Sequence, residues 1–344
     1  MISVGVDAWN LPGDRRGIGR YVRALLTQWR HFSNRIRPVL IVPEWHTWTV
    51  AGRYRTEVSG QRLKVVSRRY HRRADLDLLW FPFNGPSWTK FSLPSVATLH
   101  DASTFVLAGF DEAARATFRL AASRCTHIIT DSDFSKRELT RELQLPDGCI
   151  TAIPLGIGAP LPVTPTRLDV TALGRFVLFV GENELRKGYD TLVAALAQLA
   201  QNGVRIPLVV AGVPKDAAAT GYTFPIHILG HVDDATLGAL YRSCAMFVYP
   251  SRYEGFGLPV LEAMSYGVPV IASSAASIPE AGGDAALYID PGDANALAER
   301  ISNVWSDPAL AKALEQRGLA RAAAMPWRRT AEKTLEVFEM VARK

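Results

Sequence analysis

The chain has 344 residues, of which 48% are hydrophobic, and this length suits two domains of ordinary size better than one core. No apolar run is long enough for a membrane-spanning helix, the start lacks a secretory signal, and the three scattered cysteines fit reduced thiols, so we expect a cytoplasmic protein. Residues 1–170 carry a net charge of +8 and the remainder −2, which favours an anionic partner for the first half; no nucleic-acid-binding module is recognisable.

Short apolar runs alternate with helical patterns throughout the first half of the chain. Such alternation predicts βαβ units, a mostly parallel sheet and right-handed crossovers. The predicted strands are Ile2–Val6, Val39–Val42, Leu78–Phe81, Val96–Leu99 and His127–Thr130, and the predicted helices are Ile18–Arg30, Glu112–Arg124 and Asp133–Leu143.

Two glycines, Gly17 and Gly19, follow the first predicted strand and open a helix. Because glycine has no Cβ, the backbone there can approach a phosphate at the helix N-terminus, although a flexible βα loop is the alternative interpretation. The dinucleotide fingerprint G-x-G-x-x-G fails, since Val22 occupies the third glycine position. An NAD-dependent enzyme is therefore a disfavoured alternative.

The stretch from residue 62 to residue 73 contains six Lys and Arg and no acid. A solvated basic loop is the simplest interpretation of such a charge run. Tyr70, with Val65 and Val66, is instead suited to shallow seating at the surface of an anionic membrane, where each nearby cation contributes about 1 kcal/mol.

His100 and Asp101 follow the predicted strand that ends at Leu99. A histidine at the end of a buried strand is expected to point into the cleft between the two domains, although lone histidines are more often structural. Asp101 has two interpretations: it orients the histidine, or it bonds the local backbone.

Asp131-Ser132-Asp133 spells D-x-D, a metal-binding pattern in other enzymes. Here Ser135 and Glu138 have the spacing of a capping box, and Asp133 lies near the positive end of the predicted helix. We therefore interpret the two aspartates as helix-start residues and expect no metal site.

A proline-containing segment, Gly156–Gly174, is predicted to link the domains, which we place at residues 1–165 and 166–326, followed by a C-terminal helix at 327–344. A second βα series follows the linker. Its predicted strands are Phe176–Val180, Pro207–Ala211, Ile226–Leu229, Met246–Tyr249 and Val268–Ile271, and its predicted helices are Tyr189–Leu199, Asp234–Cys244 and Leu258–Tyr266.

Two adjacent cations, Arg186 and Lys187, follow the strand that ends at Val180. Cations at the carboxyl end of a strand can clamp a diphosphate and offset its charge as it leaves. The alternative is a solvated basic turn.

Glu254 and Glu262 are separated by seven residues in a segment that reads strand, glycine loop, helix. Pro259 suits the first turn of that helix, whose exposed N–H groups favour an anion. The segment can hold a sugar nucleotide, with amides for phosphate and carboxylates for hydroxyl groups; an ordinary βα loop with two solvated glutamates is the alternative. The loop between the acids begins Gly255, Phe256, Gly257, Leu258.

Together these segments resemble the retaining glycosyltransferases of family 4. The resemblance covers nearly the whole chain and is most specific at the E-x7-E run that starts at Glu254 and at Arg186-Lys187-Gly188; it departs at Glu182, where many relatives have arginine. It implies an α/β protein of the GT-B fold, with two doubly wound Rossmann-like domains and a last helix that crosses back to the first domain.

The resemblance also implies the reaction and the role of each residue. A hexose moves from a nucleoside diphosphate sugar to a sugar acceptor with retention, without cofactor or metal. His100 lies beside the donor sugar, Arg186 and Lys187 hold the diphosphate, and Glu262 holds the ribose hydroxyls. Donor binding falls further to Gly17, Gly19, Glu254 and the Gly255–Leu258 amides.

The segments around His100 and around Arg186 look most like bacterial mannosyltransferases of polysaccharide assembly. This favours GDP-mannose as donor and a lipid-linked acceptor at the inner face of the membrane, with the enzyme bound peripherally. A UDP-hexose-dependent enzyme and a catalytically silent sugar-nucleotide-binding protein remain as alternatives.

Overall fold

The computed structural model describes residues 1–14, 17–43, 63–110, 112–160, 169–182, 184–213 and 221–343. Its contacts divide the chain into two compact units. Unit 1 comprises Met1–Gly156 and Trp327–Lys344, and unit 2 comprises Ile157–Pro326. The division at Gly156 falls before the expected boundary at residue 165.

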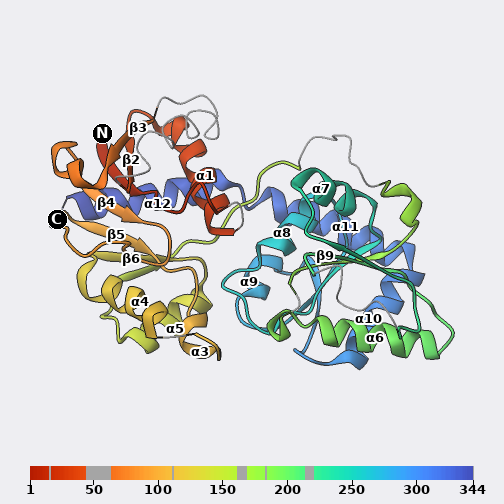
Figure 1. The fold of residues 1–344 in the computed structure, drawn as a ribbon. Helices are drawn as coiled ribbons and strands as arrows, with labels where there is room; N and C mark the ends of the chain where they lie inside the picture. Colours follow the sequence, from red (N-terminus) through yellow and green to blue (C-terminus); the bar gives the residue numbers. More distant parts are fainter. Residues whose placement is uncertain are drawn as a thin grey trace. The chain divides into compact units, whose positions relative to one another are not determined.

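Unit 1 contains a seven-stranded sheet in the order β3-β2-β1-β4-β5-β6-β7, and every pairing is parallel (Figure 1). Its inner strands are buried along most of their length, as in parallel sheets that are covered on both faces. The strands are β1 (Ile2–Asp7), β2 (Ile36–Val42), β3 (Lys64–Ser67), β4 (Leu78–Phe81), β5 (Ser95–Thr98), β6 (His127–Thr130) and β7 (Ile150–Ala152). The helices are α1 (Gly17–Gln28), η1 (Trp29–Phe32), η3 (Arg68–Arg73), α3 (Ser103–Val106), α4 (Glu112–Arg124), α5 (Asp133–Leu143) and α12 (Trp327–Ala342).

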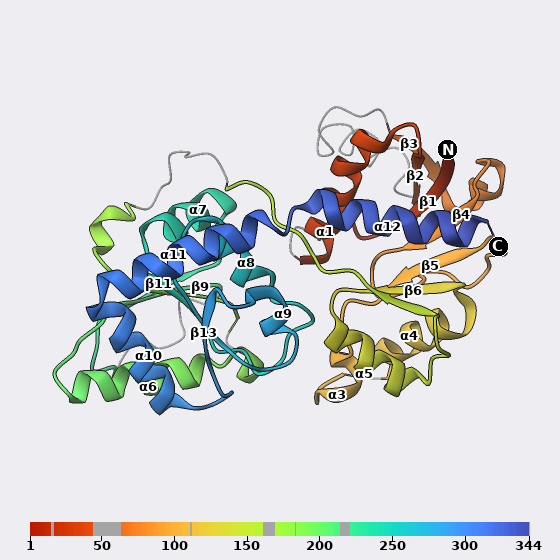
Figure 2. The same cartoon turned by 180° about the vertical axis from the view of Figure 1, so that it is seen from behind.

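The last helix, α12, belongs to unit 1 and lies beside α1 in both views of the fold (Figures 1 and 2). Its apolar side packs on the sheet, and the Trp29 indole N–H donates to the carbonyl of Ala331 at 3.0 Å. Arg35 forms a two-pronged ion pair with Glu339, both contacts at 2.9 Å. The C-terminal segment is thus part of the core of unit 1.

Unit 2 contains a six-stranded parallel sheet in the order β10-β9-β8-β11-β12-β13. Helices α6 and α10 pack together against one face of it, around a cluster of buried aliphatic side chains. The strands are β8 (Val177–Val180), β9 (Leu208–Ala211), β10 (Ile226–Gly230), β11 (Met246–Tyr249), β12 (Val270–Ser273) and β13 (Ala286–Ile289). The helices are η4 (Thr171–Leu173), η5 (Leu185–Lys187), α6 (Tyr189–Gln201), α7 (Asp234–Ser243), α8 (Leu258–Ser265), α9 (Ile278–Gly282), α10 (Ala294–Ser306) and α11 (Pro308–Ala323).

The basic stretch at 62–73 is not the loop that its charge suggested. Lys64–Ser67 forms the edge strand β3 beside β2, and Arg68–Arg73 forms the 3₁₀ helix η3. Val66 packs against the core of unit 1, so it is not available for a membrane surface. Arg62 lies outside the described residues.

The predicted capping box at Ser135 is also wrong. Helix α5 begins at Asp133, and its N-cap is Ser132, whose hydroxyl accepts from the backbone N–H of Ser135 at 3.0 Å. Ser135 therefore lies inside the first turn.

No helix among the described residues is both long and apolar enough to cross a bilayer. The three cysteines, Cys125, Cys149 and Cys244, are free thiols.

A buried carboxyl group lies at the last residue of strand β1 in unit 1. Asp7 is 1% exposed, and its Oδ2 accepts from the backbone N–H of Ser87 at 3.2 Å. Burial raises the pKa of Asp7 to about 7, while Ser87 and the charge of Arg68 oppose the rise. Because the folded protein holds this proton and the unfolded chain releases it near pH 4, folding stability should fall as pH rises from about 4 to about 7.

We therefore expect Asp7→Asn, which keeps an acceptor for Ser87 but cannot ionise, to stabilise the protein at pH 8 more than at pH 5. Each unit of pKa corresponds to about 1.4 kcal/mol, and about two units of the shift lie between pH 5 and the folded-state pKa, so the difference between the two pH values should be about 2.7 kcal/mol. Denaturant unfolding of both proteins at the two pH values measures it. An equal effect of the substitution at both values would contradict the assigned pKa.

Candidate active site

Two neighbouring loops of unit 2 bring the predicted donor-binding residues together. Strands β8 and β11 are adjacent and parallel, so the loops after Val180 and Tyr249 leave the same edge of the sheet. In open parallel sheets, ligands bind outside this carboxyl edge. The first loop carries Arg186 and Lys187, and the second carries Glu254.

A glycine locks the two loops against each other. Gly188 has a φ of +68°, and a Cβ there would lie 2.1 Å from the carbonyl oxygen of Pro250. The backbone N–H of Arg252 donates to the carbonyl of Arg186 at 2.7 Å. A side chain at position 188 would therefore force apart the segments that hold Lys187 and Glu254.

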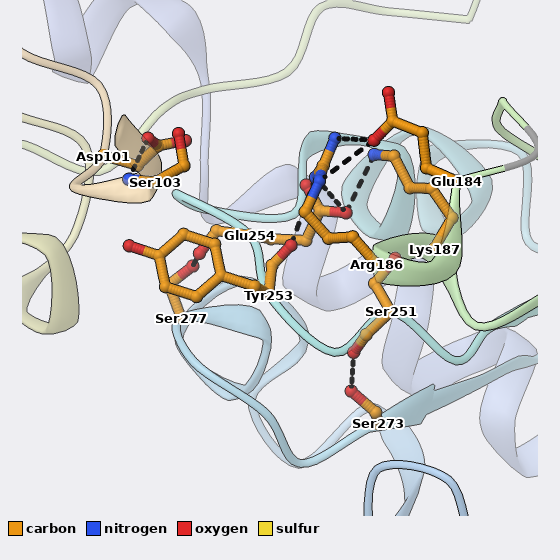
Figure 3. A network of polar contacts seen from close by, with 10 residues as sticks. All are labelled: Asp101, Ser103, Glu184, Arg186, Lys187, Ser251, Tyr253, Glu254, Ser273 and Ser277. Atoms are coloured by element: carbon orange, nitrogen blue, oxygen red, sulfur yellow. Dashed lines mark hydrogen bonds and ion pairs between the residues drawn. The ribbon is translucent and has the colours of Figure 1, made fainter. Parts of the chain in front are cut away.

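Glu254 lies between the two cations (Figure 3). Its Oε1 is 2.8 Å from the Lys187 ammonium and 3.3 Å from Nη1 of Arg186, and its side chain is 12% exposed. Arg186 also donates to the Glu184 carboxylate at 2.9 Å and to the Tyr253 carbonyl at 3.2 Å. The predicted cations and the first predicted acid thus form one ion-paired cluster.

The three side chains of the cluster are partly shielded from water, so their charges interact more strongly than they would in bulk solvent. Burial lowers the pKa of Arg186, but the carboxylates of Glu254 and Glu184 outweigh it and hold that pKa above its ordinary value. Burial, and then the charge of Glu254, raise the pKa of Tyr249 well above its ordinary value. Tyr249 therefore stays a neutral phenol beneath the cluster, with the Lys187 ammonium 5.8 Å from its ring centre.

The glycine loop and α8 complete the site. Gly257 is the N-cap of α8 with a φ of +102°, where Leu258 begins the helix. The Ser277 hydroxyl of the neighbouring turn donates to the Glu254 carbonyl at 2.7 Å. The Ser273 hydroxyl donates to the Ser251 carbonyl in the same loop. Figure 3 shows how these two serines anchor the loop from below.

Glu262 lies one turn inside α8, and its side chain is largely buried. The Tyr241 hydroxyl donates to its carboxylate at 3.5 Å. A buried acid held by a neutral donor retains acceptor capacity for further hydroxyl groups. Gly255 and Phe256 lie in the loop between the two acids, with Phe256 buried.

His100 has an unforeseen partner in unit 1. Its Nδ1 is 2.8 Å from Asp131 Oδ2, and its Nε2 is 2.9 Å from the carbonyl oxygen of Pro82. Because a carbonyl only accepts, Nε2 carries a proton, and the second proton is shared between Nδ1 and the Asp131 carboxyl group. Both ring nitrogens are therefore engaged within unit 1.

This geometry corrects the interpretation of Asp131 and decides between the two interpretations of Asp101. Asp131 is the buried partner of His100 and does not start a helix, whereas Asp133 is the first residue of α5, as predicted. Asp101 does not orient the histidine; its Oδ1 accepts from the backbone N–H of Ser103 at 2.8 Å (Figure 3). No group of three potential metal ligands occurs among the described residues.

The two N-terminal glycines differ in what requires them. A Cβ on Gly19 would lie 1.8 Å from the carbonyl oxygen of Asp14, whose carboxylate accepts from the Gly19 N–H at 3.1 Å. Gly19 is thus needed by the fold of its own loop. A Cβ on Gly17, where α1 begins, would meet none of the described residues within 4 Å.

Comparison with known proteins identifies the family. Residues 172–321 match the family model "Glycosyl transferases group 1". The O-antigen chain mannosyltransferase B of Escherichia coli is 32% identical over 288 residues, which cover 75% of this chain and 74% of the relative. The chain belongs to the group 1 glycosyltransferases, the retaining enzymes of family 4.

Other relatives and solved structures agree with this assignment. The phosphatidyl-myo-inositol mannosyltransferase of Mycobacterium leprae is 28% identical to this glycosyltransferase over 75% of the chain and 72% of the relative. Sucrose-phosphate synthase from Thermosynechococcus elongatus superposes with a TM-score of 0.73 at 19% identity, covering 99% of both chains. The predicted α/β architecture with the GT-B fold is confirmed, and the enzyme binds a nucleotide-sugar donor.

Loss of Lys187 should impair this glycosyltransferase in the chemical step. A charge-assisted contact that strengthens as the diphosphate leaves contributes about 2.7–4 kcal/mol, so Lys187→Ala should lower donor turnover about a hundredfold or more. Lys312→Ala, which removes an exposed lysine from the same unit, is the matched control. Initial rates of nucleoside diphosphate release measure both variants, and near-normal turnover of folded Lys187→Ala would remove Lys187 from the mechanism.

Proposed function

We propose that the protein transfers mannose from GDP-mannose to a hydroxyl group of a sugar acceptor, with a lipid-linked acceptor in surface polysaccharide or glycolipid assembly. The observation that carries the proposal is the cluster of Arg186, Lys187 and Glu254 at the carboxyl edge of the unit 2 sheet. Similarity to an O-antigen mannosyltransferase over three quarters of the chain supports the choice of sugar.

In the proposed reaction, Arg186 and Lys187 bind the donor diphosphate and stabilise its charge as the bond to the sugar breaks. Glu254 then exchanges its two cations for hydroxyl groups of the donor sugar, together with the amides of Gly255–Leu258. Glu262 accepts from the ribose hydroxyls. The acceptor hydroxyl attacks from the face that the diphosphate leaves, and a phosphate oxygen takes its proton, so the configuration is retained.

His100, Gly17 and Gly19 remain in the proposal with reduced roles. Because both nitrogens of His100 are already bonded, a contact with the donor sugar requires its Nε2–H to leave the Pro82 carbonyl. The described residues leave space beside Gly17 at the start of α1, as a phosphate or an acceptor group would need. Gly19 shapes the loop that carries it.

A UDP-hexose is the second candidate donor. The Anabaena protein Alr3699/HepE, solved in complex with UDP-glucose, superposes with a TM-score of 0.73 at 16% identity. Identity at that level supports a common fold alone. The choice of a guanine nucleotide over a uracil nucleotide as donor therefore rests on the mannosyltransferase relatives.

The proposed place of action is the cytoplasmic face of an anionic membrane. The charge of +8 on residues 1–170 supports it, and so does the exposed end of η3, where Tyr70 is 48% exposed beside Arg69 and Arg72. Cations near an anionic surface contribute about 1 kcal/mol each, which gives reversible binding that weakens with salt.

The donor proposal is tested by thermal unfolding in the presence of nucleotide sugars. A ligand at a hundred times its Kd stabilises the folded state by about 2.7 kcal/mol. GDP-mannose should raise the midpoint of unfolding more than UDP-glucose does, and the rise should persist in EDTA because the proposed site uses no metal. A larger effect of UDP-glucose would contradict the donor assignment, and loss of the effect in EDTA would contradict the absence of a metal.

A further inference from the structure

A depression of about 800 Å³ lies at one edge of the unit 1 sheet. Pro43 follows β2, Arg68 follows β3, and Ser87–Lys90 follows β4, and all of these border the depression. The three strands are parallel, so their carboxyl ends meet at this edge. It is the edge at which open parallel sheets bind ligands.

The charge around this pocket is of one sign. Arg68, Arg69, Arg72 and Lys90 line it, and none of the described lining residues is an acid. Within the described residues, Arg69, Arg72 and Lys90 have no ion-pair partner, whereas Arg35 of the same unit is paired with Glu339. The carboxyl group of Asp7 lies near Arg68 but is buried, and burial raises its pKa to about 7. The other three cations repel one another, and an anion between them relieves that repulsion.

Arg68 is held in place before any ligand arrives. Its Nη2 donates to the Ser87 hydroxyl at 2.7 Å, and its guanidinium lies 4.7 Å from the centre of the Trp88 ring. Its Nε–H and the Trp88 indole N–H are covered and find no acceptor among the described residues. Burying an N–H group without an acceptor costs free energy, so an oxyanion that accepts from these two groups would be stabilised. A small rotation of the two side chains would make both N–H groups accessible to it.

We propose that this pocket binds the phosphate or diphosphate group through which the acceptor sugar is attached to its carrier. The inference rests on the proposed function, since it names the acceptor of that reaction. Planar guanidinium groups bind phosphate oxygens in pairs, and the four cations around this depression suffice to balance the two negative charges of a diphosphate that links a sugar to a carrier. The pocket thereby selects phosphorylated acceptors over neutral glycosides.

The test compares two soluble probes by calorimetry: a glycosyl diphosphate with a short alkyl chain, and the same alkyl glycoside without phosphate. The parent should bind the diphosphate at least about tenfold more tightly, an advantage that shrinks as salt is raised. Arg72→Ser combined with Lys90→Ser should abolish the advantage. Arg137→Ser combined with Arg329→Ser removes two exposed cations from helices of unit 1 and should preserve it.

GDP-mannose binding, measured on the same variants, separates this inference from the donor assignment. The pocket variant should bind GDP-mannose like the parent, because the donor cluster lies in unit 2. If GDP-mannose binds no variant while the phosphate probe behaves as expected, the donor assignment fails and the pocket assignment stands.

Two outcomes overturn the pocket assignment. One is that the parent binds the two probes with equal affinity, or that the pocket variant and the control variant lose the preference for the diphosphate probe to the same extent. The other is a pocket variant that still binds the diphosphate probe but no longer co-sediments with vesicles of anionic phospholipid, which would assign these cations to lipid headgroups.

Discussion

The ion-paired carboxylate of Glu254 is the interaction on which the site depends. Two cations held at the edge of a sheet repel each other, and Glu254 partly neutralises them at 2.8 Å and 3.3 Å. A single carboxylate balances only one of the two charges, and Glu184 supplies a second carboxylate to Arg186. In the proposed reaction, a diphosphate takes over this pair of cations without a further cost of bringing them together.

Sheet topology and glycine geometry make that pairing possible. β8 and β11 are neighbours in the sheet, although 65 residues lie between the end of β8 and the start of β11. Lys187 and Glu254 are therefore brought together by the pairing of the parallel strands. Gly188 then allows the two loops to touch through the Pro250 carbonyl. In unit 1, the same kind of edge gathers Arg69, Arg72 and Lys90, which have no ion-pair partner among the described residues, whereas the cations of unit 2 are held by carboxylates within ion-pair distance.

The sequence predicted the periodic elements well and the long-range partners poorly. Helix α5 occupies Asp133–Leu143 as expected, because its apolar spacing and flanking polar residues are local signals. Strand β3 was missed, since its short, charged sequence resembles a loop until β2 pairs with it. The bond between His100 and Asp131 joins residues 31 positions apart, and no spacing rule foretells it. Motif resemblance located the cluster of Glu254, but not its ion pairing.

The most direct test of this account is the affinity of Glu254→Gln for GDP, measured by calorimetry and set beside its donor turnover. Glutamine keeps the size of the side chain and removes the charge that competes for Arg186 and Lys187. GDP should bind more tightly to the variant while turnover falls, because the diphosphate no longer competes with the charge of Glu254 for Arg186 and Lys187 and the donor sugar loses its carboxylate. Weaker GDP binding, or unchanged turnover, would contradict the claim that Glu254 exchanges its cations for the sugar when the donor binds.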